Sequence, residues 1–160
     1  MIIVKRILVP IDFGQTSDAA LAYGVQLARM FGARLHLLHV FDVATGIREY
    51  PVPAVDASDS KTLDQLAAQL SGTERRELRP VCESRLGAPA DEILDFASQR
   101  DIDLIVMGTH GREGIARALL GSVAETVVRR SACPVLTVHS PERDVFMEEV
   151  RVNCATQTAS

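Results

Sequence analysis

Glycine residues at fixed intervals are the residues of this chain best placed to do chemistry. They follow the short apolar run 103–107 in the pattern Gly108-x2-Gly111-x9-Gly121-Ser122. Glycine lets a chain turn sharply off a strand and lets a ligand approach the backbone closely. Gly121 and Ser122 stand where a further helix is expected to begin, and the N–H groups of a helix N-terminus bind phosphate oxygens. The segment therefore predicts an anion-binding loop.

The side chains of the same segment leave two interpretations open. Arg112 and Arg117 would supply cationic partners for an anion, and the Ser122 hydroxyl would add a donor. The His110 ring either contacts a phosphate or faces water. The alternative is a glycine-rich turn with an ordinary serine cap, but the full spacing between an apolar strand and a helix favours binding. The pattern lacks the Gly-Lys-Ser/Thr of a Walker loop and the Gly-x-Gly of a dinucleotide-binding fold.

A second candidate follows the first apolar run of the chain. Residues 2–9 are rich in β-branched side chains and end at Pro10, and Asp12 follows in the turn. The Asp12 carboxylate either binds a ligand or only accepts hydrogen bonds from the N–H groups of that turn. In a parallel sheet, ligands bind beyond the carboxyl ends of strands where the winding reverses. We expect the strands before Asp12 and Gly108 to be neighbours at that point.

The elements that position these residues alternate regularly. Helices are expected over residues 18–31, with Thr16 or Ser17 as the cap, over 58–70, from Pro89 onwards and over 119–130. Strands are expected over residues 2–9, 34–40, 79–86, 103–107 and 134–138. Alternation of this kind predicts an α/β fold, with a parallel sheet and helices on both faces. Residues 1–140 are expected to form one domain, and residues 141–160 a C-terminal tail that is partly disordered or docked.

Composition excludes several classes of function. The 160 residues carry a net charge of −4, which argues against a nucleic-acid binder that relies on bulk electrostatics. No apolar run approaches the length of a membrane span, and the N-terminus does not resemble a signal peptide. The three cysteines, Cys82, Cys133 and Cys154, have neither disulfide nor zinc spacing. A reducing cytoplasm is the expected location.

The remaining polar residues have structural interpretations. His36 and His39 are three apart on a strand, so they point to opposite faces and cannot share a metal. Cys133 precedes Pro134 and has no base or cation in an obvious relay, so a buried or inert thiol is expected. The run 74–77, Glu-Arg-Arg-Glu, is interpreted as a solvated helix end.

Taken together, these motifs resemble the nucleotide-binding signature of the universal stress proteins. The resemblance rests on the glycine pattern from Gly108 to Ser122 and on Cys133-Pro134 with the strand that follows. The segments 7–12 and 37–40 match the first two strands of that family. It implies a single doubly wound five-stranded parallel sheet of order 3-2-1-4-5 with helices on both faces. It also implies a homodimer formed through the last strand, Val135, Leu136, Thr137 and Val138, which this order leaves at an apolar edge.

When the roles of the family's motif residues are carried over to the matching positions, the resemblance implies an ATP site. The Asp12 carboxylate would contact the ribose hydroxyls or a Mg²⁺ ion bound to the phosphates. The Val40 backbone would meet the adenine, and Pro10 and Met107 would line the base and sugar pocket. The residues that would hold the ribose and phosphates are Gly108, Thr109, His110, Gly111, Arg112, Gly121, Ser122 and Val123.

Three functions remain open from the sequence. The first is a dimeric, cytoplasmic ATP-binding regulator of the stress response, in which nucleotide occupancy changes a surface read by an unknown protein partner. The second is a slow Mg²⁺-dependent ATPase, although no general base, nucleophile or arginine finger is evident near Asp12. The third is a nucleotide-free interaction module of the same fold. The expectation is a binding protein with at most weak ATP hydrolysis.

Overall fold

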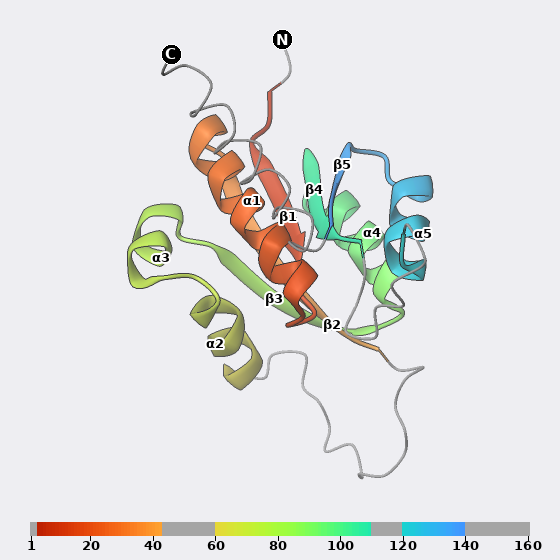
Figure 1. The fold of residues 1–160 in the computed structure, drawn as a ribbon, viewed down its shortest axis with the longest axis horizontal. Coiled ribbons are helices and arrows are strands. Elements are labelled where there is room, and N and C mark those ends of the chain that lie inside the picture. The colour runs from red at the N-terminus through yellow and green to blue at the C-terminus, as the bar shows by residue number, and fades with distance from the viewer. Residues whose placement is uncertain (1–2, 43–59, 110–119, 140–160) are drawn as a thin grey trace, which may run out of the picture.

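The computed structural model describes residues 3–42, 60–109 and 120–139 (Figure 1). Strands and helices alternate along this part of the chain as the sequence predicted. The elements are β1 (Arg6–Pro10), α1 (Gln15–Phe31), β2 (Arg34–Asp42), α2 (Ser60–Ala68), α3 (Gly72–Leu78), β3 (Val81–Gly87), α4 (Pro89–Gln99), β4 (Leu104–Gly108), α5 (Ser122–Arg130) and β5 (Val135–Val138). None of the described helices is long and apolar enough to cross a membrane.

The five strands form one parallel sheet of order β3-β2-β1-β4-β5, which confirms the predicted fold class. β1 is central, with Ile7 paired to Leu35 of β2 on one side and to Leu104 of β4 on the other. The winding reverses between β1 and β4, because β2 and β3 lie beyond β1 and β5 lies beyond β4. The carboxyl ends of β1 and β4 therefore lie side by side at the switch point.

The helices cover both faces of the sheet (Figure 1). On one face, α1 and α2 bury a cluster of apolar side chains that includes Ile7, Val9 and Leu37. On the other, α4 and α5 pack against Leu8 and Leu38. Each central strand thus buries alternate residues on opposite sides, which is why its sequence is apolar almost throughout.

The start of α1 differs from the prediction. Neither Thr16 nor Ser17 is the N-cap. Gly14 takes that position, and both predicted cap residues lie buried in the first turn of the helix. The Ser17 hydroxyl donates to the Gly14 carbonyl over 2.9 Å. The helix begins early because the Asp12 carboxylate already accepts the Gly14 N–H and closes the turn before it.

Residues 74–77 are solvated, as predicted, but they belong to a separate short helix, α3, which the sequence did not predict. Ser71 begins α3 with a capping box, in which its hydroxyl accepts from the Glu74 N–H and its own N–H donates to the Glu74 carboxylate. Arg79 ends α3 in the left-handed conformation, so β3 starts at Val81 rather than at residue 79. Other boundaries differ as well: β1 begins at Arg6 rather than at residue 2, β2 continues to Asp42, α2 ends at Ala68 and α5 starts at Ser122.

The predicted division of the chain at residue 140 stays a prediction. Residues 140–160 lie outside the described residues.

His36 is a polar residue that is buried in the core. It is 5% exposed, packs edge-on against the Phe96 ring at 5.9 Å, and neither of its ring nitrogens has a hydrogen-bond partner among the described residues. Burial lowers the pKa of His36 below its ordinary value of 6.5, and Arg34, Arg100 and Arg6 lower it further, against an opposing effect of Glu83. The folded protein therefore favours the neutral imidazole.

We expect the free energy of unfolding to fall as the pH drops below about 6.5. Because the pKa of His36 is lower in the folded state, protonation favours the unfolded chain, and above that pH the group makes no pH-dependent contribution. The loss can reach about 1.4 kcal/mol per pH unit down to the folded-state pKa. Urea unfolding of wild type and of His36→Leu at pH 7.5 and 5.5 would measure it, with exposed His139→Gln as the control. An equal pH sensitivity in His36→Leu and wild type would contradict the assignment.

Candidate functional site

The turn after β1 is built around the Asp12 carboxylate. Its Oδ1 accepts the Gly14 N–H over 2.8 Å, which confirms the structural role that the sequence left open. Its Oδ2 has no hydrogen-bond partner among the described residues. Phe13, the residue between Asp12 and Gly14, has a φ of 61°, a conformation rare for a bulky residue. The turn therefore leaves one oxygen of a half-buried carboxylate at the switch point for a ligand.

The end of β2 extends beyond the end of β1. Leu38 is the last residue of β2 that pairs with β1, and its carbonyl accepts the Ile11 N–H over 2.8 Å. If β1 continued, the next ladder bond would join the Val40 N–H to the Ile11 carbonyl. Instead the Ile11 carbonyl accepts a hydrogen bond from His39 Nδ1 over 2.7 Å. Val40 directs its N–H and C=O to the same side as Leu38, where no described residue of β1 pairs with them.

A backbone edge of this kind suits the hydrogen-bonding edge of a planar ligand. It agrees with the role that the family resemblance implied for Val40. The bond also fixes the tautomer of His39, because only a protonated Nδ1 can donate to a carbonyl.

The end of β4 packs tightly on the first turn of α1. A Cβ placed on Gly108 would lie 2.7 Å from Thr16 Oγ1 and 2.8 Å from the Thr16 carbonyl carbon. Such distances are shorter than real contacts allow, so the glycine is needed here for helix packing. From the sequence, Gly108 was predicted to let a ligand approach the backbone, and the structure adds helix packing as a second reason for a glycine.

The N-terminus of α5 is tied to the end of β4. Thr109, which is fully buried, donates its N–H to the Val138 carbonyl and accepts the Gly121 N–H on its own carbonyl. Gly121 is the N-cap, and no side chain of the described residues caps the helix. Ser122, exposed at the first position of α5, and Val123 follow. The N–H groups of this first turn point to the carboxyl edge of the sheet, where the helix dipole favours an anion.

The structure brings most of the predicted site residues to one edge. Those at strand ends are Pro10, Asp12, Val40, Met107, Gly108 and Thr109, and those at the start of α5 are Gly121, Ser122 and Val123. Met107 is only 4% exposed and packs among the side chains under α4 and α5, so its side chain contributes to the core. His110, Gly111 and Arg112 lie outside the described residues.

No group of three or more histidine, cysteine or acidic side chains that could hold a metal occurs among the described residues. Among the described residues, Asp12 therefore has no protein partners for a metal site, and a metal there would also need oxygens from elsewhere, such as those of a nucleotide.

An open parallel sheet with helices on both faces, and with a helix N-terminus and a carboxylate at its switch point, defines a doubly wound α/β domain. Residues 4–139 match the Universal stress protein family, and the chain belongs to that family. A curated relative, Universal stress protein MJ0531 of Methanocaldococcus jannaschii, is 33% identical over 150 residues, covering 88% of this chain and 85% of the relative.

Two solved structures are similar in fold and sequence. The structure of hypothetical protein MJ0577, also from Methanocaldococcus jannaschii, has a TM-score of 0.65 and 30% identity, covering 86% of this chain and 96% of that one. A universal stress protein in complex with cAMP has a TM-score of 0.60 and 26% identity, covering 86% and 98%. Nucleotide binding thus occurs in a related protein of the same fold.

Sequence reasoning missed two residues that shape the site. The sequence led to a structural interpretation of His39 and assigned no role to Phe13. The Phe13 ring lies 4.9 Å from the His39 ring, which in turn lies 4.7 Å from Phe41. The sequence signal for His39 was its position one residue before Val40, but a hydrogen bond to a carbonyl on another strand leaves no local pattern.

The contact of Gly108 with α1 gives a sharp test. Gly108→Ala is expected to lower the free energy of unfolding by about 1–3 kcal/mol, the usual cost of overpacking. Thr16→Ala should not restore it, because the added Cβ would also collide with the Thr16 backbone at 2.8 Å. Chemical denaturation of the two single variants and the double variant would measure this. Gly72→Ala, where the nearest atom to the added Cβ is 3.7 Å away, is the control. A full rescue by Thr16→Ala would show that only the side chain is crowded.

Proposed function

We propose that this universal stress protein binds ATP, as its Mg²⁺ complex, at the carboxyl edge of the sheet. The observation that carries the proposal is the N-terminus of α5, which has no side-chain cap among the described residues and is held beside the end of β4 by the Thr109–Gly121 hydrogen bond. In this arrangement Ser122 and Val123 would receive the phosphates, and Asp12 Oδ2 would face the ribose or the metal. The Val40 backbone edge would receive the adenine.

The proposed action is that of a nucleotide-dependent switch in the cytoplasmic stress response. A ligand shifts a protein between two conformations only if it binds one of them more tightly. The segment between β4 and α5 joins two elements that would both contact the nucleotide. Phosphate contacts at the start of α5 would therefore change the conformation of this segment. An unidentified protein partner would read that difference.

The binding proposal is tested by the double variant Gly121→Val/Ser122→Ala. We expect at least tenfold weaker ATP binding in calorimetry, because the serine donor is lost and the valine side chain obstructs the phosphates. Mass spectrometry of nucleotide released on denaturing the wild-type protein gives an independent measurement. Unchanged ATP affinity in the double variant would show that the phosphates bind elsewhere. Thermal unfolding at wild-type temperature is the control for intact folding.

A second test separates binding from hydrolysis. Asp12→Asn keeps an oxygen to accept the Gly14 N–H but removes the charge that a Mg²⁺ ion requires. If the protein is a slow ATPase, this variant should bind ATP yet release at least tenfold less phosphate than wild type. If it is a binding protein alone, wild type itself should release no more phosphate than a buffer control. Asp12→Ala, which loses both functions of the side chain, shows the cost of opening the turn.

We also propose that two copies pair through β5. This strand is an edge of the sheet, since β4 is its partner on one side and Leu136 is 38% exposed. An apolar edge strand offers unpaired backbone groups to a second copy, and symmetric pairing closes after two copies.

The dimer proposal predicts that Leu136→Glu shifts the protein to monomers. Two carboxylates brought together across a symmetric strand pair would repel each other and would have to lose hydration. Sedimentation velocity at micromolar concentration would measure the shift. Val128→Glu, at an exposed position of α5, is the matched control and should leave the dimer intact. A monomeric wild-type protein would remove the proposal.

A further inference from the structure

The outer flank of α1 carries large apolar side chains that no described residue covers. Met30 is 75% exposed and Tyr23 is 53% exposed. The two residues are seven positions apart, which is about two turns, so they lie in line along the helix. Phe31, 47% exposed, continues this strip to the C-terminal end of α1. Apolar side chains gathered on one surface indicate that another segment covers them.

The strip faces away from α3, towards the side of α1 on which β5 lies. α1 contacts α3 on one side and β5 on the other (Figure 1). Arg29 marks the α3 side, because its guanidinium donates to the Glu77 carboxylate over 2.8 Å. Tyr23 and Met30 lie about a third of a turn from Arg29, on the opposite flank. Leu27 lies between them and packs against the apolar cluster that includes the last residue of β5.

The chain leaves the described sheet at the start of this flank. Val138, the last residue of β5, pairs with Gly108, which lies against Thr16 in the first turn of α1. Met30 is fourteen residues beyond Thr16, which is about 21 Å along the helix at about 1.5 Å per residue. An extended chain covers about 3.3 Å per residue, so seven residues span about 23 Å. Counted from Val138, the residue that can reach Met30 is Val145.

The segment that begins there is both apolar and acidic. Val145, Phe146 and Met147 are consecutive, with Asp144 before them and two glutamates, at positions 148 and 149, after them. Residues 144–150 contain no basic residue. A surface that matches this segment would combine exposed apolar side chains with cations that have no partner of their own.

The end of α1 supplies such cations. Arg34 begins β2, and its N–H donates to the Lys5 carbonyl over 2.7 Å, which joins the segment before β1 to the chain that follows α1. Both side chains are exposed, and neither forms an ion pair with a described residue. The nearby carboxylate of Asp103 accepts two backbone N–H groups, and that of Asp101 pairs with Arg6.

Another apolar side chain stands beside the same hydrogen bond. Ile3 is 60% exposed and lies two residues before Lys5. The C-terminal end of the strip is therefore apolar with cations next to it, which complements residues 144–150 in both respects.

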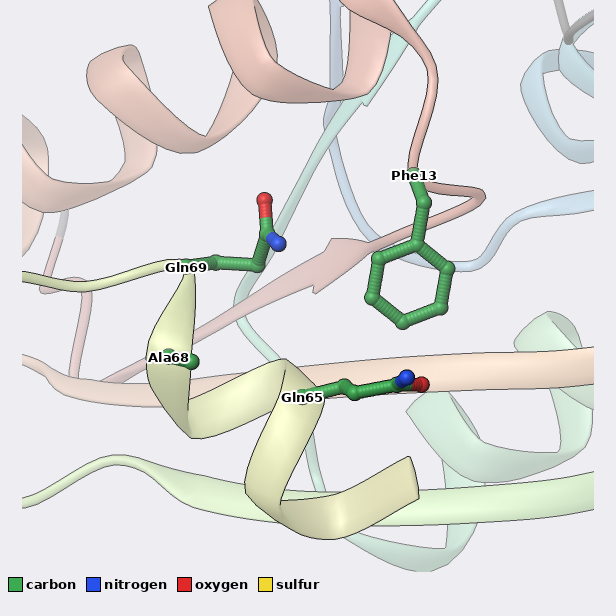
Figure 2. A pocket seen from close by; sticks show the side chains of 4 residues that line it. All are labelled: Phe13, Gln65, Ala68 and Gln69. Carbon is green, nitrogen blue, oxygen red and sulfur yellow. The ribbon is translucent and has the colours of Figure 1, made fainter. Parts of the chain in front are cut away.

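The open depression on this face of the sheet lies elsewhere. Phe13, Gln65, Ala68 and Gln69 line its volume of about 350 Å³ (Figure 2). α2 contacts β2 and β3, which lie on the other side of β1 from β5. A chain that leaves β5 therefore meets the flank of α1 before it can reach this depression.

We propose that residues 144–150 of the same chain bind along the end of this strip. The apolar residues 145–147 cover Met30 and Phe31, and the carboxylates on either side of them approach Lys5 and Arg34. Residues 139–143 then run past Tyr23. The contact does not depend on a nucleotide, so it stands or falls independently of the proposed function.

Cysteine cross-linking tests the contact, because a disulfide forms readily only between side chains that come close together. In a Cys154→Ser background, Met30→Cys/Phe146→Cys should form an intramolecular disulfide at least tenfold faster than Gln69→Cys/Phe146→Cys. Both surface positions are exposed, so neither substitution disturbs the core. Mass spectrometry of tryptic peptides from the oxidised monomer identifies the linkage. Adding Lys5→Glu/Arg34→Glu to the Met30 variant should slow the reaction severalfold.

Each other outcome overturns the proposal. Equal rates in the two cysteine pairs would show that the segment meets the surface without binding to it. A faster reaction with Gln69→Cys would place the segment in the depression at α2. A disulfide that forms only between chains, when Met30→Cys and Phe146→Cys proteins are mixed, would show that a second copy covers the strip. An unchanged rate after Lys5→Glu/Arg34→Glu would show that the carboxylates do not approach these cations.

Discussion

The hydrogen bond from the His39 ring to the Ile11 carbonyl determines where the central strand leaves the sheet. The carbonyl of the residue after β1 would otherwise continue the ladder with β2. Because a side chain of β2 itself occupies that carbonyl, the chain turns out of the sheet at Asp12, and β2 continues to Asp42 without β1 beside it. The step between the two strand ends exposes a backbone edge at Val40. The same bond holds the imidazole against which Phe13 packs, so the geometry of the turn, the edge and the aromatic surface all depend on it.

A series of close contacts connects the turn after β1 to β4 and α5, on the other side of the switch point. The first turn of α1 begins at the Asp12 turn, and its Thr16 packs so closely on Gly108 that no side chain fits between them. The next residue, Thr109, is buried and holds Gly121 at the start of α5. The N-termini of α1 and α5 are thus connected through rigid neighbours on both sides of the sheet. Groups held in place before a ligand arrives need not be ordered when it binds, which favours affinity.

The alternating pattern of the sequence was sufficient to predict the architecture, because parallel strands buried on both faces need continuous apolar runs such as Ile7-Leu8-Val9. It also predicted that the strands before Asp12 and Gly108 would be neighbours, which the pairing of β1 with β4 confirms. The capping box of α3 was readable at Ser71 and Glu74, but the run of charges after it was given more weight than the serine before it. The roles of His39 and Phe13 depend on contacts between different strands and on a positive φ. Neither leaves a periodic signal, so local propensity could not find them.

Gly108 shows that a sequence motif can be recognised correctly while one of the physical reasons for its glycine is missed. A glycine that follows a strand and precedes a loop is expected to admit a ligand, and in this fold the same absence of a side chain also admits the α1 backbone. The two demands act on one position, so a substitution there changes the fold and the site together. Ser122 is different, because its side chain is exposed and caps nothing among the described residues. In a protein with a net charge of −4, the backbone dipoles at the start of α5 supply a local attraction for an anion, and this attraction is short-ranged.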